Sequence, residues 1–229
     1  MSGPPPRPSV RAASIWAVLC TVGFAITAAF VLLGPFAAAD RNGILAVRTL
    51  ASPGMTEVML AASSVAHGKL AIPLALLLAA LIYRINGRDD AVFYTVACLA
   101  GEALYVTLKE VFRQRRPTGI SPKLTDAGSF GFPSGHTMMA IVIFGLGAVI
   151  ATRHAPRIAR IAAIGCAALV VVLVGVSRIY LGAHWPSDVI GALFAGVAWS
   201  AACLAWEERR RHAAPATETG GPQSPYNAA

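Results

Sequence analysis

One histidine has a carboxylate at a spacing that suits catalysis. His184 is followed four residues later by Asp188, a separation of about one helical turn. A carboxylate that hydrogen-bonds one imidazole nitrogen fixes the tautomer and leaves the other nitrogen available to attack an electrophile. The pair therefore predicts nucleophilic chemistry, and the alternative is a histidine held in a salt bridge at a membrane interface.

A second histidine, His136, follows Pro133, Ser134 and Gly135, a sequence typical of a helix start. Ser134 is a suitable N-cap, and the unpaired backbone N–H groups of a first helical turn form a site for an anion. Gly135 would let a phosphate approach the backbone closely. Taken alone, the segment is also compatible with an ordinary helix start.

Basic residues flank both histidines. Pro117 disfavours helix at Arg116, so Lys109 and Arg116 can converge from a helix end and a loop. Arg178 lies shortly before His184. Three further basic residues are expected to be ordinary interfacial side chains, with lipid headgroup docking as the alternative: Arg113, Arg115 and Lys123.

The composition is typical of a membrane protein. Of the 229 residues, 56% are hydrophobic and only 13% are charged, and the mean hydropathy is +0.62. Soluble domains carry about 25% charged residues. The net charge of +8 comes from basic residues placed between apolar runs. We therefore expect membrane topology and an anionic substrate to explain this charge, and we expect no nucleic-acid binding.

Six apolar segments approach the roughly 20 residues that a helix needs to cross a bilayer. They are residues 14–38, 70–86, 91–111, 134–152, 158–177 and 188–206. The sequence therefore predicts an all-α polytopic membrane bundle with six transmembrane helices. The second segment is short and contains Pro73, so a start near Thr56 is an alternative. Residues 40–69 mix apolar and charged residues and predict one or two short interfacial helices between the first two spans.

The remaining organisation follows from charge and composition. We expect residues 1–13 to be a disordered cytoplasmic N-terminus, 14–208 the six-span domain, and 209–229 a basic and then disordered tail. The first span is expected to be retained, although residues 37–39 resemble a signal cleavage site. The basic residues expected on the cytoplasmic side include Arg84, Arg88, Arg153, Arg157, Arg160, Arg209, Arg210 and Arg211. This positive-inside pattern places both termini in the cytoplasm and the histidine clusters at the outer, periplasmic face.

Taken together, the three clusters resemble the signature of the phosphatidic acid phosphatase type 2 superfamily. That signature is Lys, six residues, Arg-Pro; then Pro-Ser-Gly-His; then Ser-Arg, five residues, His, three residues, Asp. The chain matches every signature position: Lys109, Arg116, Pro117, Pro133, Ser134, Gly135, His136, Ser177, Arg178, His184 and Asp188. The match spans residues 109–188, about a third of the chain, and the flanking segments fit the six-span membrane branch.

The resemblance implies a role for each matched residue. His184 would attack phosphorus and become phosphorylated, and Asp188 would orient it. His136 would protonate the leaving oxygen and then activate water. Five residues would bind the phosphate oxygens: Lys109, Arg116, Ser134, Gly135 and Arg178. The resemblance implies no metal and no cofactor, since the cations supply the positive charge that phosphoryl transfer needs. A neutral His184 working with a protonated His136 predicts a bell-shaped dependence of rate on pH.

Other readings remain open at this point. A vanadate-dependent haloperoxidase or a secreted acid phosphatase shares the resemblance but lacks the apolar spans. A non-catalytic lipid-binding or transport protein would be expected to lose a histidine or an arginine. A metal site built from His136, His184 and Asp188 is disfavoured by the surrounding cations. The substrates that fit are phosphatidate, lysophosphatidate, phosphatidylglycerol phosphate and undecaprenyl pyrophosphate. Gly191 and Ala195 could pack within one chain or between two, so the oligomeric state is open.

A few residues outside the signature have weaker expectations. Glu102 and Tyr105 share the helical face of Lys109, which is compatible with a supporting hydrogen-bond network or with burial against a neighbouring helix. Three side chains are expected at the membrane interface: His67, Tyr180 and Trp185.

Overall fold

The computed structural model of the chain describes residues 10–66, 70–119, 124 and 130–213. In these residues the only extended pairing is an isolated bridge between Arg115 and Phe130, and the all-α expectation is confirmed. The helices are α1 (Val10–Leu33), α2 (Ala37–Arg48), α3 (Pro53–Ser64), α4 (Ala71–Asn86), α5 (Arg88–Phe112), α6 (Gly135–Ala140), the π-helix η1 (Ile141–Leu146), α7 (Gly147–Ala151), α8 (Arg157–Tyr180) and α9 (Pro186–Ala213).

Four helices are long and apolar enough to cross a membrane. These are α1, α5, α8 and α9, with 24, 25, 24 and 28 residues. The two other expected spans are shorter: α4 and the continuous stretch Gly135–Ala151. A 16-residue helix such as α4 is about 24 Å long, less than the roughly 30 Å of hydrocarbon. The count of six spans therefore stays a prediction. The alternative start near Thr56 is not observed, because α3 and α4 are separate helices.

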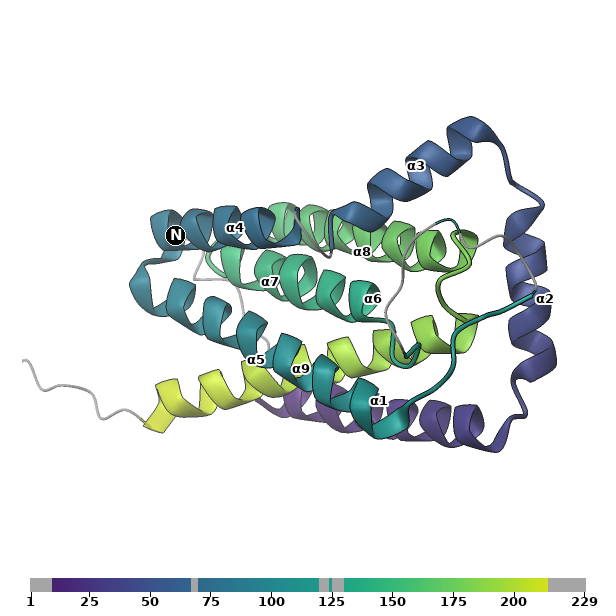
Figure 1. Cartoon of the computed structure of the whole chain (residues 1–229). Coiled ribbons are helices and arrows are strands. Elements are labelled where there is room, and N and C mark those ends of the chain that lie inside the picture. Colours follow the sequence, from purple (N-terminus) through teal and green to yellow (C-terminus); the bar gives the residue numbers. More distant parts are fainter. Residues whose placement is uncertain (1–9, 67–69, 120–123, 125–129, 214–229) are drawn as a thin grey trace, which may run out of the picture.

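Most helices follow a common axis, whereas α2 crosses one end of the bundle and α3 runs back along α8 (Figure 1). The outer faces of α1, α4 and α8 expose large apolar side chains such as Leu19, Leu77 and Ile161. Such continuous apolar surfaces face lipid in integral membrane proteins. Several boundaries differ from the sequence-based expectation: α1 begins at Val10 and ends at Leu33, before residue 38, and α9 continues to Ala213. Residues 1–9 and 214–229, expected to be disordered, lie outside the described residues.

The stretch α6–η1–α7 forms the centre of the bundle and contacts α4, α5, α8 and α9. Met138, Val142, Leu146 and Ile150 along it are fully buried. Within η1, the carbonyl of Ile143 accepts a hydrogen bond of 3.1 Å from the hydroxyl of Tyr94 on α5. Because the first turns of this stretch are almost entirely buried, they are held at a fixed position at one end of the bundle.

Small residues on α9 allow close helix packing within the chain. A Cβ atom at Gly191 would overlap the ring of Phe132. Ala195 is buried in a cluster with Met138 and Tyr105. Both residues therefore pack against other parts of the same chain.

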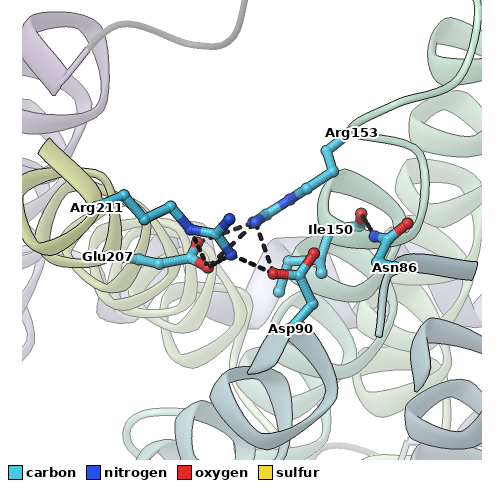
Figure 2. A network of polar contacts seen from close by, with 6 residues as sticks. All are labelled: Asn86, Asp90, Ile150, Arg153, Glu207 and Arg211. Carbon is cyan, nitrogen blue, oxygen red and sulfur yellow. Dashed lines mark hydrogen bonds and ion pairs between the residues drawn. The ribbon is translucent and has the colours of Figure 1, made fainter. Parts of the chain in front are cut away.

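The end of the bundle away from α2 is closed by a cluster of charged side chains (Figure 2). Arg153 donates hydrogen bonds to Asp90 at 2.8 Å and to the two Glu207 oxygens at 3.1 and 2.8 Å. Arg211 donates to Glu207 at 2.7 Å and also pairs with Asp90. Two arginines expected only as topology signals are thus neutralised by two carboxylates, and the cluster joins α5, the α7–α8 turn and α9.

We expect Glu207→Gln to destabilise the protein by about 2 kcal/mol, because two arginines would lose their shared carboxylate in a poorly solvated site. Thermal unfolding of the detergent-purified protein measures this loss. Glu208→Gln is the matched control, since Glu208 pairs at 3.3 Å with His212, whose side chain is 73% exposed. Equal unfolding temperatures for the two variants would contradict a stabilising role for the cluster.

Candidate active site

The signature residues gather at the end of the bundle that α2 crosses (Figure 1). Lys109 lies in the last turn of α5, Ser134 precedes α6, and Arg178 lies in the last turn of α8. His184 precedes α9 and Asp188 lies in its first turn. Helix ends from four parts of the chain therefore meet, as the sequence-based topology requires.

His184 is held by its backbone and by Asp188. Its amide donates to the carbonyl of Arg178 at 3.2 Å across a turn in which Gly182 has a φ of +67°. Nδ1 lies 3.1 Å from Oδ2 of Asp188, and both side chains are fully buried. The same oxygen accepts a hydrogen bond of 3.0 Å from the amide of Trp185. With Oδ2 accepting from it, Nδ1 carries the proton, which leaves the Nε2 lone pair as the nucleophile.

Arg116 faces that second nitrogen. Its Nη1 donates to the carbonyl of Ala183 at 2.7 Å and lies 3.0 Å from Nε2 of His184. A guanidinium can only donate, so this contact requires Nε2 to accept and agrees with the tautomer set by Asp188. Burial, followed by the charge of Arg116, holds the pKa of His184 well below its ordinary value of 6.5. The histidine is therefore neutral near pH 7.

Arg178 brings a second buried guanidinium to the site. It is 2% exposed, and its Nη1 donates to the hydroxyl of Ser63 on α3 at 2.5 Å. Its Nε has no hydrogen-bond partner among the described residues. A buried cationic donor of this kind is well placed to bind an anion.

The start of α6 is tied to the start of α9. The amide of Ser134 donates to the carbonyl of Asp188 at 3.0 Å. Ser134 occupies the expected N-cap position, but its hydroxyl does not cap the helix and instead accepts from Thr137 at 3.1 Å. The half-buried His136 is close enough to interact electrostatically with His184. The two histidines therefore sit on two helix starts joined by a backbone hydrogen bond.

Tyr105 links the lysine to the glycine of the signature. The Nζ of Lys109 lies 4.9 Å from the centre of the Tyr105 ring, a cation–π contact. The ring also fills the space beside Gly135, where a Cβ atom would overlap it. Glu102 is half-buried and interacts with Lys109 electrostatically. Tyr105 is thus buried, as one of the two alternatives expected, and it contacts Lys109 through the face of its ring.

The sequence did not indicate that the short helices α2 and α3 supply polar groups to the site. Asp40 of α2 accepts two hydrogen bonds from Ser187, from its amide at 2.8 Å and from its hydroxyl at 2.6 Å. Burial raises the pKa of Asp40, and the bonds from Ser187 oppose that rise. Ser63 of α3 holds Arg178. A carboxylate directly after an apolar segment was a signal that could have identified Asp40.

Other expectations have mixed outcomes. Tyr180 is not an interfacial anchor, because it is buried and its hydroxyl lies 2.9 Å from that of Thr56. Trp185 is only partly buried, and its ring nitrogen donates to the carbonyl of Arg115 at 2.9 Å. Arg113 is exposed and pairs with Glu110 at 3.4 Å. Two positions lie outside the described residues: His67 and Lys123.

Sequence relatives are membrane-lipid phosphatases. Phosphatidylglycerophosphatase B of Bacillus subtilis is 28% identical over 176 residues, which cover 76% of this chain and 86% of the relative. Undecaprenyl-diphosphatase of Sulfolobus acidocaldarius is 32% identical over 117 residues, which cover 48% of this chain and 50% of that protein.

Solved structures show the same fold. A transmembrane PAP2-type phosphatidylglycerolphosphate phosphatase from Bacillus subtilis superposes with a TM-score of 0.77 at 27% identity, covering 84% of this chain and 96% of the other. Aquifex aeolicus LpxE has a TM-score of 0.55 at 23% identity, covering 70% and 92%. The family model of the PAP2 superfamily matches residues 90–212, which contain both histidines, Asp188 and the site cations Lys109, Arg116 and Arg178. The chain belongs to the PAP2 superfamily.

Proposed function

We propose that this membrane phosphatase hydrolyses a lipid phosphate or diphosphate through a covalent phosphohistidine at His184. The observation that carries the proposal is the pairing of a buried His184 Nδ1 with Asp188 while Nε2 faces Arg116. A nucleophilic nitrogen, an orienting carboxylate and an anion-binding cation are therefore in direct contact. The relatives named above support a lipid substrate.

In the first step, Nε2 of His184 attacks phosphorus and a P–N bond forms. The bond from phosphorus to the lipid oxygen breaks, and His136 gives its proton to that oxygen. Asp188 stabilises the positive charge that develops on the imidazole. Because Arg116 contacts the attacking nitrogen, it must turn from Nε2 towards the phosphate oxygens when the substrate binds.

In the second step, the roles of the histidines reverse. His136, now neutral, takes a proton from water, and the resulting hydroxide attacks the phosphohistidine. The P–N bond breaks, inorganic phosphate leaves, and the neutral His184 is restored. Lys109, Arg116 and Arg178 surround the equatorial oxygens with positive charge, and the first amides of α6 add hydrogen bonds. These groups supply the electrostatic stabilisation that metal ions provide in other phosphotransferases.

An apolar groove supports a lipid over a soluble ester. It has a volume of about 600 Å³, lies between α4 and α5, and reaches Met139 and Ile143 of the central stretch. Glu102, on the same helix face as Lys109, lines it. A prenyl or acyl chain in this groove would leave its phosphate at the ends of α5 and α6.

We also propose that six helices span the membrane, with both termini in the cytoplasm and the active site at the outer face. The basic residues that support this orientation include several beyond the charge cluster: Arg84, Arg88, Arg157, Arg209 and Arg210. The central stretch is short for a bilayer, but most of its residues are buried against other helices, so it need not match the bilayer thickness by itself.

We expect His184→Ala to lower phosphate release by at least about a thousandfold, because the variant lacks the attacking nitrogen. Release is measured with purified protein in EDTA, using phosphatidylglycerol phosphate, undecaprenyl pyrophosphate, phosphatidate and a soluble phosphate ester. His154→Ala is the matched control, since His154 is exposed at the opposite end of the bundle.

Three outcomes of that assay would change the proposal. Activity that survives in His184→Ala means that another group is the nucleophile. Loss of wild-type activity in EDTA favours the metal-site alternative. A folded wild type that is inactive on every substrate favours the non-catalytic alternative. The fastest substrate of the panel identifies the preferred lipid.

The depressed pKa of His184 predicts the acid side of the rate profile. Since the folded pKa lies well below 6.5, His184 stays neutral as the pH falls from 7, and kcat/KM declines through its protonation only well below pH 6.5. Loss of the His136 proton produces the alkaline decline. Arg116→Gln removes the nearest cation and should move the acid limb towards pH 6.5. A profile that is flat from pH 5 to 8, or an acid limb that does not move in the variant, contradicts this assignment.

Asp40 is expected to be a positioning residue. Asp40→Ala removes the two oxygens that accept hydrogen bonds from Ser187. The first turn of α9, which carries Asp188, can then shift. We expect kcat to fall about tenfold to a hundredfold with little change in KM, since small misplacements of reacting groups have effects of this size. Asp40→Asn keeps one acceptor oxygen and should recover most of the activity. A purely structural role would lower the folded fraction of Asp40→Ala without changing kcat per folded molecule.

A further inference from the structure

A second groove lies at the opposite end of the bundle from the candidate active site. It has a volume of about 640 Å³ and runs between the start of α5 and the end of α9. The residues that line it are Arg88, Asp89, Val92, Phe93, Val96, Trp206, Glu207, Arg210 and Arg211. Both helices are long enough to cross a membrane, and Val92, Val96 and Trp206 of the groove are exposed.

The polar end of this groove is positively charged. Glu207 and Arg211 belong to the charge cluster of Figure 2, where Glu207 accepts hydrogen bonds from two arginines. Its negative charge is therefore already balanced. Arg88 and Arg210 add two positive charges, against which the lining offers the single exposed carboxylate of Asp89. The cluster also fixes the last turns of α9 against α5, so the groove is formed before any ligand binds.

The other part of the groove is apolar and aromatic. The rings of Phe93 and Trp206 stack with centroids 6.4 Å apart and an angle of 17°. The guanidinium of Arg210 lies 4.7 Å above the Trp206 ring, which holds the cation at the boundary between the two parts. Val92 and Val96 are more than half exposed along the same helix. Val96 lies about 12 Å along the helix axis from Arg88. With Arg88 at the membrane interface, Val96 would lie in the hydrocarbon region.

We propose that this groove binds an anionic phospholipid from the leaflet at that end of the bundle. The phosphate would lie between Arg88 and Arg210, and an acyl chain would follow Val92 and Val96. A soluble anion would gain nothing from the apolar wall. A zwitterionic lipid would gain less than an anionic one from the excess of arginine. This site is separate from the proposed phosphatase site and does not depend on its activity.

The test measures lipid binding to the full-length protein in detergent by native mass spectrometry. The probes are palmitoyl-oleoyl phosphatidylserine and phosphatidylcholine, phosphodiesters that differ in net charge. We expect wild type to bind phosphatidylserine at least about tenfold more tightly, with an affinity that falls as salt is added. Arg88→Gln/Arg210→Gln should weaken phosphatidylserine binding about tenfold and leave phosphatidylcholine binding unchanged.

Arg84→Gln/Arg157→Gln is the matched control, because it removes the same charge from exposed positions at the same end but outside the groove. If phosphatidylserine binding weakens equally in both double variants, the lipid responds to the overall positive charge at this end and not to the groove. That result would overturn the site. Equal affinity of wild type for the two lipids would overturn it as well. If phosphatidylserine binds only after residues 214–229 are removed, then that segment occupies the groove in the full-length protein. This result would also overturn the lipid site.

Val96→Trp tests the apolar part without any change of charge. The larger side chain should fill the groove and weaken phosphatidylserine binding, while hydrolysis of a soluble phosphate ester stays at the wild-type rate. Retained hydrolysis shows that the variant is folded and that the lipid site is distinct from the active site. Undiminished lipid binding in a folded Val96→Trp variant would overturn the placement of the acyl chain.

Discussion

The structure of the site depends on holding several positive groups beside one buried histidine. Lys109, Arg116 and Arg178 repel one another, so their side chains must be fixed by contacts that are stronger than this repulsion. Those contacts come from a carbonyl for Arg116, a hydroxyl of α3 for Arg178 and an aromatic ring for Lys109. These three partners carry no negative charge, so these contacts hold the cations without neutralising them.

The arginines at the two ends of the bundle have different kinds of partner. At one end, Asp90 and Glu207 neutralise Arg153 and Arg211, and the result is a mechanical connection between helices (Figure 2). At the other end, the carboxylate of Asp188 accepts from His184 and from the amide of Trp185 at the start of its own helix. Burial alone therefore does not show whether an arginine stabilises the fold or binds an anion. The groups that it contacts decide between these roles.

That the signature residues meet at one end of the bundle could be predicted from the sequence, whereas the contacts that hold them there could not. His184 and Asp188 are separated by one helical turn, and local spacing is enough to bring them together. Asp40 and Ser63 are far from their partners in the chain, so only the packing of α2 and α3 reveals their contacts. Hydropathy located α4 and the central stretch to within two residues, but both are shorter than the long helices, so their crossing of the bilayer stays a prediction.

The backbone hydrogen bond from Ser134 to the carbonyl of Asp188 has a consequence for substitutions elsewhere in the chain. It sets the spacing of the two helix starts that carry the histidines without using any side chain. The side chains that line the apolar groove between α4 and α5 take no part in this contact. A substitution in the groove can therefore alter the fit of a lipid chain and leave the backbone link between the two helix starts in place.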